Sequence, residues 1–304
     1  MIIPLPKTTT GEINNELVRL RMEGGVVTLG RVMTLVVDAT CCDAEKAIEA
    51  ANHASREHPC RVVVLAKSDA KGARLDAEIR VGGDAGASEV VILKPSGEMA
   101  EHGDTLVIPL LLPDAPIVAW WPGPVTLAPA LTALGAMATR RITDARESED
   151  PKKALLALAD GYAPGDTDLA WARVTRWRAL LAAALQQAGS PHVTHVRIHG
   201  DLDSPSILLL GAWLRGALGC EFDATYDKDA QGLVSVVLET PDGEISIKRN
   251  DGKNATFSQV GLPDRVIALA RRTLQDCLSE DLRRLDADEV YGEALIGLAS
   301  TLRT

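Results

Sequence analysis

The segment GYAPGDTDLAWARVTRWRALLAAALQQA at residues 161–188 has the strongest secondary-structure pattern in the chain. Its opening loop ends in three residues that can cap a helix, Asp166, Thr167 and Asp168. A long run of strong helix formers follows directly. Apolar residues then recur at spacings of three and four, which is typical of a helix with one buried face. We therefore predict one long central helix over residues 167–188.

The first turns of this predicted helix have an unusual composition, because indole and guanidinium groups crowd together beside the capping carboxylates. The residues concerned are Trp171, Arg173, Arg176, Trp177 and Arg178. Trp177 continues the apolar stripe and is expected in the core, whereas Arg173 is expected to be exposed or paired with a carboxylate. This mixture favours an interface, either with a partner or between domains of the same chain, and the sequence leaves both possibilities open.

Length and composition indicate a two-domain protein. A chain of 304 residues is long enough for two cores. The formal net charge of −10 argues against binding to nucleic acid or to an anionic membrane surface. No signal peptide and no apolar window long enough to span a bilayer is apparent, so a soluble, cytoplasmic protein is expected.

Strand and helix patterns alternate along residues 1–148, which predicts an N-terminal α/β domain with a mainly parallel sheet flanked by helices. Strands are expected at residues 26–37, 61–67, 75–81, 89–94, 117–121 and 141–143. Helices are expected at residues 11–23, where Gly24-Gly25 would end the helix, at 43–57 and 98–112, and over about ten residues from Ala128. Pro109 should kink or shorten the third of these helices.

A charged segment at residues 145–152 is predicted to join this domain to a C-terminal α/β domain at residues 149–304, built from a mixed sheet with helices. Strands are expected at residues 193–199, 221–225, 233–239 and 244–250, with Pro241-Asp242-Gly243 forming a hairpin turn. In addition to the central helix, helices are expected from Pro151 and at residues 204–218, 263–277 and 288–302.

Motifs for catalysis and cofactor binding are missing from the sequence. It has no G-x-G-x-x-G opening a helix, no Walker-type phosphate loop, no G-x-S-x-G and no H-E-x-x-H. Gly82–Gly86 joins two strand patterns and is expected to be a tight turn. Five cysteines without a C-x-x-C pair indicate neither a zinc site nor a disulfide framework. We predict no catalytic residues, no metal and no cofactor.

The sequence WWPG at residues 120–123 ends a predicted strand. Partners and ligands of open α/β sheets meet the carboxyl ends of strands, and adjacent strand residues point to opposite faces. Trp120 and Trp121 therefore cannot fill the same core. Either both pack under flanking helices, or one indole is available at a partner interface.

Three motifs together resemble a known family: WWPG at 120–123, RRITDA at 140–145 and PGDTDLAWARVTRWRALLAAAL at 164–185. Their order, their spacing and the total length are similar to those of the glucose-6-phosphate dehydrogenase assembly protein OpcA family, actinobacterial type. The resemblance implies a non-enzymatic protein that binds glucose-6-phosphate dehydrogenase. It also implies that this binding promotes assembly or allosteric activation of the enzyme and so controls the oxidative pentose phosphate pathway.

The same motifs supply the candidate partner-binding residues. The apolar anchors would be Trp120 and Trp121, presented by Pro122 and Gly123, and an adjacent polar rim would be formed by Arg140, Arg141 and Asp144. The central helix would be capped by Asp166, Thr167 and Asp168. It would be joined to its surroundings by Trp171, Arg173, Trp177 and Arg178. A different function remains open, because the cleft near Trp121 and Arg141 would suit a sugar phosphate or nicotinamide nucleotide, with Arg140 and Arg141 clamping a phosphate.

Overall fold

The computed structural model describes residues 1–23, 32–68, 70–82, 89–202, 204–249 and 251–303. The chain forms two compact units. The first unit contains Met1–Asp144 and Leu274–Ala287, and the second contains Ala145–Thr273 and Asp288–Thr304. The structure thus places Leu274–Ala287 with the N-terminal half, whereas the sequence assigned all residues after 149 to the second domain.

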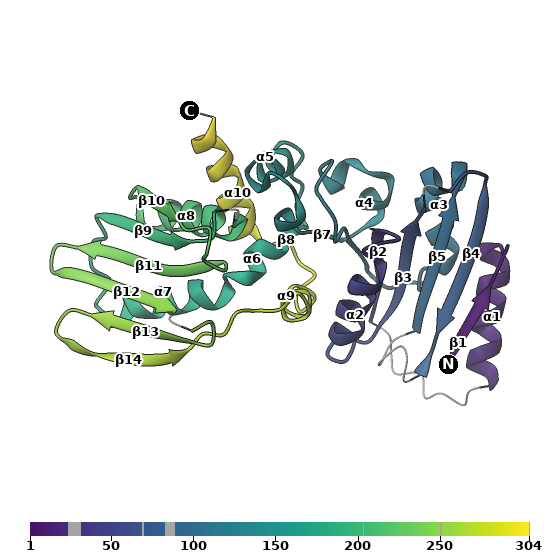
Figure 1. The fold of residues 1–304 in the computed structure, drawn as a ribbon, viewed down its shortest axis with the longest axis horizontal. Helices are drawn as coiled ribbons and strands as arrows, with labels where there is room; N and C mark the ends of the chain where they lie inside the picture. Colours follow the sequence, from purple (N-terminus) through teal and green to yellow (C-terminus); the bar gives the residue numbers. More distant parts are fainter. Residues whose placement is uncertain (24–31, 69, 83–88, 203, 250, 304) are drawn as a thin grey trace. The chain divides into compact units, whose positions relative to one another are not determined.

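A mixed sheet forms the centre of the first unit (Figure 1). Those of its strands that belong to the first unit run in the order β1 (Ile2–Leu5), β4 (Arg74–Arg80), β5 (Glu89–Ser96), β3 (Cys60–Lys67), β2 (Met33–Thr40), β6 (Ile117–Trp120) and β7 (Arg140–Thr143). The strands from β5 to β7 are parallel, and β1 and β4 add antiparallel pairs at one edge. The predicted mainly parallel sheet flanked by helices is confirmed.

Helices cover both faces of this sheet. They are α1 (Thr10–Glu23), α2 (Ala44–Ala54), α3 (Gly103–Val107), α4 (Ala133–Met137) and α9 (Leu274–Asp281). One core joins α1, α3 and α4 to inward-facing residues such as Val36 and Val63. Their strand neighbours Val37 and Val64 point the other way and are also fully buried, on the face where α2 contacts β2 and β3. A sheet covered on both faces explains the continuous apolar run of β3.

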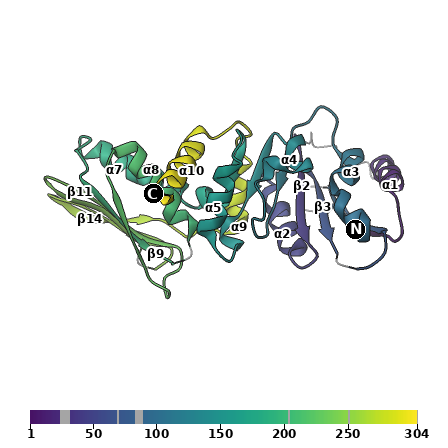
Figure 2. The same cartoon turned by 90° about the horizontal axis from the view of Figure 1, so that it is seen from above.

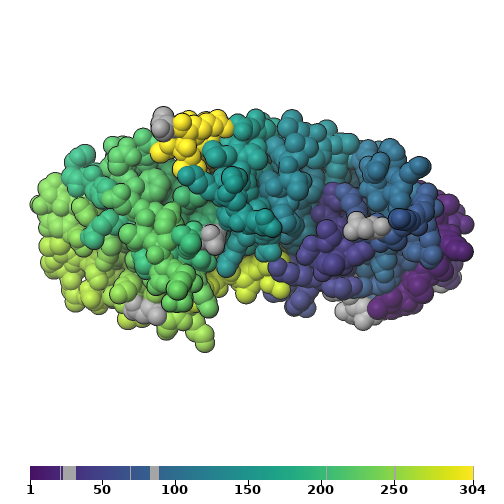
Figure 3. Space-filling model, turned by 45° about the horizontal axis from the view of Figure 1, so that its top comes forward, coloured from purple at the N-terminus to yellow at the C-terminus, as the bar shows by residue number. Residues whose placement is uncertain are grey.

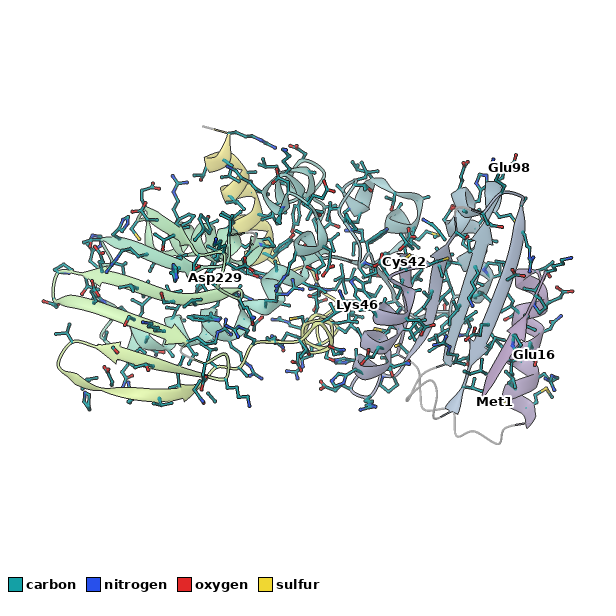
Figure 4. All side chains as sticks on the ribbon, viewed as in Figure 1. Met1, Glu16, Cys42, Lys46, Glu98 and Asp229 are labelled. Atoms are coloured by element: carbon teal, nitrogen blue, oxygen red, sulfur yellow. The ribbon has the colours of Figure 1, made fainter. Side chains whose placement is uncertain are left out.

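Segment Leu274–Ala287 packs on helix α2 of the same unit, as Figure 3 shows by the contact of yellow-green and blue-violet atoms. His58 Nε2 lies 3.0 Å from the carbonyl oxygen of Ser279, and the Arg283 side chain pairs with Glu57 at 3.3 Å. Cys277 of α9 is buried, whereas Cys41 and Cys42 are exposed in the turn before α2 (Figure 4).

Two predicted helices of the first unit are shorter than expected. Residues 97–110 form a 3₁₀ helix (Gly97–His102), α3 and a second 3₁₀ helix (Ile108–Leu110). The end of α3 at Val107 fits the position of Pro109, which has no N–H to donate within a continuous helix. The helix predicted from Ala128 is interrupted at Thr132, whose backbone is extended. The Thr132 side chain caps α4 by accepting a hydrogen bond from the Gly135 N–H at 2.9 Å. The expected turns at Gly24-Gly25 and Gly82–Gly86, and part of the strand at 26–37, lie outside the described residues.

The second unit contains a mixed sheet in the order β10 (Phe222–Tyr226), β9 (His195–Gly200), β11 (Leu233–Thr240), β12 (Gly243–Arg249), β13 (Asn254–Gln259) and β14 (Leu262–Ala268). Only the β9–β10 pair is parallel among these described strands. The accompanying elements are α5 (Pro151–Asp160), a short strand β8 (Asp166–Asp168), α6 (Leu169–Arg173), α7 (Thr175–Gln187), α8 (Pro205–Leu218) and α10 (Glu289–Leu302).

Helices α7 and α8 lie on one face of this sheet (Figure 2). The opposite face is polar: Arg197 pairs there with Glu239 at 2.7 Å and with Glu244 at 2.5 Å. An antiparallel sheet with one covered and one solvated face gives the alternation of buried and exposed residues seen along β9 and β12.

Two predictions for the second unit are wrong. The single helix over 167–188 is divided, because residues 166–168 are extended and Val174 separates α6 from α7. The helix predicted at 263–277 begins only at Leu274, as α9; residues 263–268 belong instead to strand β14, which pairs with the unpredicted strand β13. Pro263 fits β14 because this strand lies at the sheet edge, where a missing N–H donor is tolerated.

Candidate functional site

Buried carboxylates organise the start of α6. Asp168 is fully buried; its Oδ1 accepts a hydrogen bond from the Ala170 N–H and its Oδ2 one from the Ala145 N–H, both at 2.8 Å. Asp168 is therefore the helix cap that the sequence predicted. Asp166 accepts the Ala163 N–H at 2.8 Å and so closes the preceding loop rather than capping the helix. The side chain of Thr167 between them is also buried.

Trp171 connects three helices of the second unit. Its Nε1–H donates to Oδ2 of Asp288 at 2.8 Å, and Oδ1 of Asp288 caps α10 by accepting the Tyr291 N–H at 3.0 Å. The guanidinium carbon of Arg178, on α7, lies 3.6 Å from the centre of the Trp171 ring. With only 2% of its surface exposed, Trp171 is a packing and hydrogen-bonding residue within this unit.

The α6–α7 junction also lines a pocket of about 160 Å³. Five arginines contribute to its wall: Arg146, Arg173, Arg249, Arg271 and Arg272. Buried Trp177 forms part of the lining, and the guanidinium carbon of Arg249 lies 5.2 Å from the centre of its ring. Arg173 is half-buried at this junction.

The two tryptophans of the WWPG motif have different environments. Trp120 is fully buried, whereas Trp121 is half-buried and packs on the first unit's core. The chain that follows exposes two large apolar side chains, Leu127 at 51% and Leu131 at 65%. Residues 121–131, named here the 121–131 loop, therefore present an apolar surface after the carboxyl end of β6, although Trp120 takes no part in it.

The prediction that Arg140, Arg141 and Asp144 form a polar rim on the surface is wrong, because all three side chains are buried. Arg140 Nη2 donates to Asp281 Oδ1 at 2.5 Å, and its Nη1 donates to the Asp286 carbonyl at 2.8 Å. Arg141 Nη1 donates to the Ala138 carbonyl at 2.8 Å. These contacts hold both guanidiniums inside the first unit, so the phosphate clamp considered near Trp121 is not formed.

The pocket in the second unit was not recognised from the sequence. Its arginines come from the turn before α5, the end of α6, strand β12 and the segment after β14, so they share no local motif. The adjacent Arg271 and Arg272 were a weak signal, but residues 263–277 were interpreted as helix. Only the pairing of β13 with β14 brings this segment to the end of β12.

Among the described residues, neither a metal site nor a membrane-spanning helix is found. No cluster of three or more His, Cys, Asp or Glu side chains that could hold a metal ion is present among the described residues. No helix in this part of the chain is both long and apolar enough to cross a bilayer.

Comparison with protein families gives two matches that follow one another along the chain. Both families are described as domains of a glucose-6-phosphate dehydrogenase subunit: residues 51–160 match its N-terminal domain, and residues 164–295 match its C-terminal domain. The matches and the fold define a two-domain α/β protein of a dehydrogenase-associated class. The chain belongs to the OpcA family of glucose-6-phosphate dehydrogenase assembly proteins. No curated protein sequence matches it.

Solved structures resemble the chain only distantly. An oxidoreductase from Sinorhizobium meliloti is 12% identical with a TM-score of 0.47, and the match covers 89% of each chain. An oxidoreductase from Thermotoga maritima is 11% identical with a TM-score of 0.43, over 90% of this chain and 96% of the other. At these scores the likeness supports no conclusion about activity.

Proposed function

We propose that the protein is a non-catalytic, cytoplasmic partner of glucose-6-phosphate dehydrogenase that promotes the assembly or allosteric activation of this enzyme. Control of the oxidative pentose phosphate pathway would follow from that activation. The observation that carries the proposal is the pair of family matches, which span both halves of the chain and both describe parts of a dehydrogenase-associated protein.

The 121–131 loop is the proposed contact with the enzyme. Leu127 and Leu131 each expose half or more of their surface, and half-buried Trp121 lies at the start of the loop. Apolar and aromatic side chains at the centre of an interface supply most of the binding energy once water is excluded. Pro122 and Pro124 restrict the backbone of the loop, which reduces the entropy lost on binding.

The buried motif residues support this surface or the fold around it and do not touch the partner. Trp120 is fully buried at the end of β6, directly before the loop, and Arg141 donates hydrogen bonds to carbonyls in the segment that follows the loop. Trp171, Trp177 and Arg178 are engaged within the second unit. This arrangement favours the interpretation of the central motif as part of the packing inside the second unit.

Activation requires a preference for one state of the dehydrogenase. A partner that binds active and inactive conformations equally shifts no population, however tightly it binds. Moving the enzyme from about 1% to about 99% active would require a differential affinity of about 5.5 kcal/mol. The loop therefore has to contact a surface that differs between the two conformations or between assembly states.

The test is a titration of the purified cognate dehydrogenase with this protein, measuring reaction rate and light scattering on the same mixtures. We expect a saturable rise in rate together with a larger species. Leu127→Asp and Leu131→Asp should each weaken complex formation at least about tenfold, because an interfacial leucine contributes roughly 1.4 kcal/mol or more and the added charge is desolvated.

Leu262→Asp is the matched control, because Leu262 is an exposed leucine, at 45%, on β14 of the second unit. It should leave complex formation unchanged. A wild-type protein that changes neither rate nor scattering would overturn the proposed function. Binding that survives both loop substitutions would instead overturn only the placement of the contact on the 121–131 loop.

A further inference from the structure

The pocket at the α6–α7 junction has a strongly positive lining. It contains five arginines and, among its described lining residues, no aspartate or glutamate. One of these arginines, Arg146, forms an ion pair with Asp201, with 4.0 Å between Nη2 and Oδ2. Clustered guanidiniums repel one another, so such a lining is costly unless an anion neutralises it.

Arg249 is the most buried of these five arginines. Only 8% of its surface is exposed, its Nη1 and Nη2 donate to the carbonyl oxygens of Leu269 and Leu233, and its buried Nε has no hydrogen-bond partner among the described residues. No carboxylate in the described part of the chain pairs with it. Burial, together with the positive charge of Arg271, lowers the pKa of Arg249 to about 10. It remains a buried cation at neutral pH.

Arg271 is held at the open side of the pocket. Its Nε–H donates to the Gln231 carbonyl at 2.9 Å, while its backbone N–H donates to the Gly252 carbonyl at 2.9 Å. Its Nη1 lies 2.4 Å from where a Cβ on Gly252 would stand, so a larger residue there would displace this guanidinium. Gly252 also has a φ of +78°, which favours glycine. The turn between β12 and β13 is thus shaped to seat Arg271.

The amino end of α8 reaches the same pocket through Ser204 and Ser206. Ser204 is the N-cap residue, yet its side chain makes no capping hydrogen bond, so its hydroxyl is available to a ligand. Pro205 at the first helical position has no N–H, and the Ile207 N–H donates to the Ser204 carbonyl at 3.1 Å, so this helix end attracts an anion mainly through the positive end of its dipole. Helix α8 has 14 residues, enough for this effect to be fully developed.

We propose that this pocket binds a phosphate group, either as free phosphate or as a small phosphate monoester. Guanidiniums and helix amino ends both match the geometry and charge of a phosphoryl group, and charge-assisted hydrogen bonds to it are among the strongest in proteins. The volume of about 160 Å³ is below the roughly 300–1,000 Å³ of sites for drug-sized ligands, so a dinucleotide does not fit inside. This ligand site is independent of the dehydrogenase contact.

Isothermal titration calorimetry of the full-length protein provides the test, with inorganic phosphate, glycerol 3-phosphate and, as the uncharged control, glycerol. All titrations are run at one ionic strength. We expect saturable binding of at least one phosphate compound and none of glycerol. Tighter binding of glycerol 3-phosphate would assign a monoester, and equal or tighter binding of inorganic phosphate would assign free phosphate.

Arg271→Gln is the diagnostic variant, since Arg271 is an exposed residue and its loss should leave the fold intact. It should weaken binding about tenfold, the effect of losing roughly 1.4 kcal/mol. Arg249→Met replaces the buried cation and should abolish binding, with circular dichroism confirming that the variant is folded. Arg197→Gln removes an exposed arginine from the open sheet face outside the pocket and should bind as the wild type does.

Absence of saturable binding of either phosphate compound to the wild-type protein would overturn the proposal. Equal weakening by Arg271→Gln and Arg197→Gln would also overturn it, because the effect would then reflect overall charge and not this pocket. Rising potassium chloride should weaken binding to the wild type, as expected for charge pairing.

Discussion

Arg140 and Asp281 form a buried ion pair with 2.5 Å between Nη2 and Oδ1, although 141 positions separate them in the sequence. Removing one member of such a pair leaves an uncompensated charge in the interior. Arg140→Ala should therefore lower the free energy of unfolding by about 3–5 kcal/mol, measured by urea denaturation. The control Arg74→Ala removes an exposed ion pair with Asp76 and should cost less than about 1 kcal/mol. Equal losses would contradict this assignment.

Trp171 gives a second prediction, because its indole combines a hydrogen bond to Asp288 with the stack against Arg178. Trp171→Phe keeps a ring but leaves the Asp288 carboxylate without that donor, so we expect a loss of about 1–3 kcal/mol. Trp171→Ala also leaves a cavity and should lose about 3–5 kcal/mol. Half-buried Trp213 provides the control, and Trp213→Phe should cost less than Trp171→Phe in the same denaturation assay.

Two glycines of α8 should respond oppositely to alanine. A Cβ on Gly211 would lie 2.3 Å from the ring of Phe222, so Gly211→Ala should overpack the contact between α8 and β10 and cost about 1–3 kcal/mol. Gly216 has open space around it, and Gly216→Ala should stabilise the protein by up to about 1 kcal/mol through higher helix propensity. Melting temperatures of the two variants should move in opposite directions; a shared direction would argue against the α8–β10 packing.

Asp251 in the turn between β12 and β13 should titrate far below an ordinary aspartate. Hydrogen bonds from the backbone N–H groups of Asn254 and Lys253 and from the Asn254 side chain lower its pKa to about 2, from an ordinary 3.8. Because the folded-state pKa is the lower one, the ionised carboxylate stabilises the turn above about pH 4. This contribution is lost as the pH falls towards about 2.

Carboxyl-carbon NMR of the wild-type protein measures this pKa directly, and a value near 4 would contradict the hydrogen bonds to Asp251. The stability difference between the wild type and Asp251→Asn should also be largest at neutral pH and shrink in acid. Since the turn seats Arg271, Asp251→Asn should in addition raise the exchange rates of the amide hydrogens of residues 252–254.

Regular elements were predictable from the sequence where one local pattern dominated. The unbroken apolar run of β3 and the capped, amphipathic pattern of α8 gave nearly correct bounds. Strand β14 was missed because Ala, Leu and Arg around residues 265–272 favour helix, and its extended form depends on pairing with β13. The break at Val174 likewise has no local signal, because every neighbouring residue tolerates a helix.

Side-chain environments were harder to predict than elements. The motif residues Arg140 and Arg141 have the polar character of surface residues, yet tertiary partners such as Asp281 and the Ala138 carbonyl draw them inside. The arginine-lined pocket depends on segments that meet only in the folded second unit. Sequence patterns within a window of a few residues hold no information about contacts between segments that are distant in the sequence.

The division of the chain also has a consequence for its synthesis on the ribosome. The polypeptide passes between the two units three times, after residues 144, 273 and 287. The first unit therefore cannot bury Arg140 against Asp281 until translation has passed residue 281, and the second unit lacks helix α10 until translation has passed residue 302. Termination at residue 148 would release a fragment whose Arg140 has lost its counter-ion, so neither unit should complete its fold before the segment 274–302 has been made.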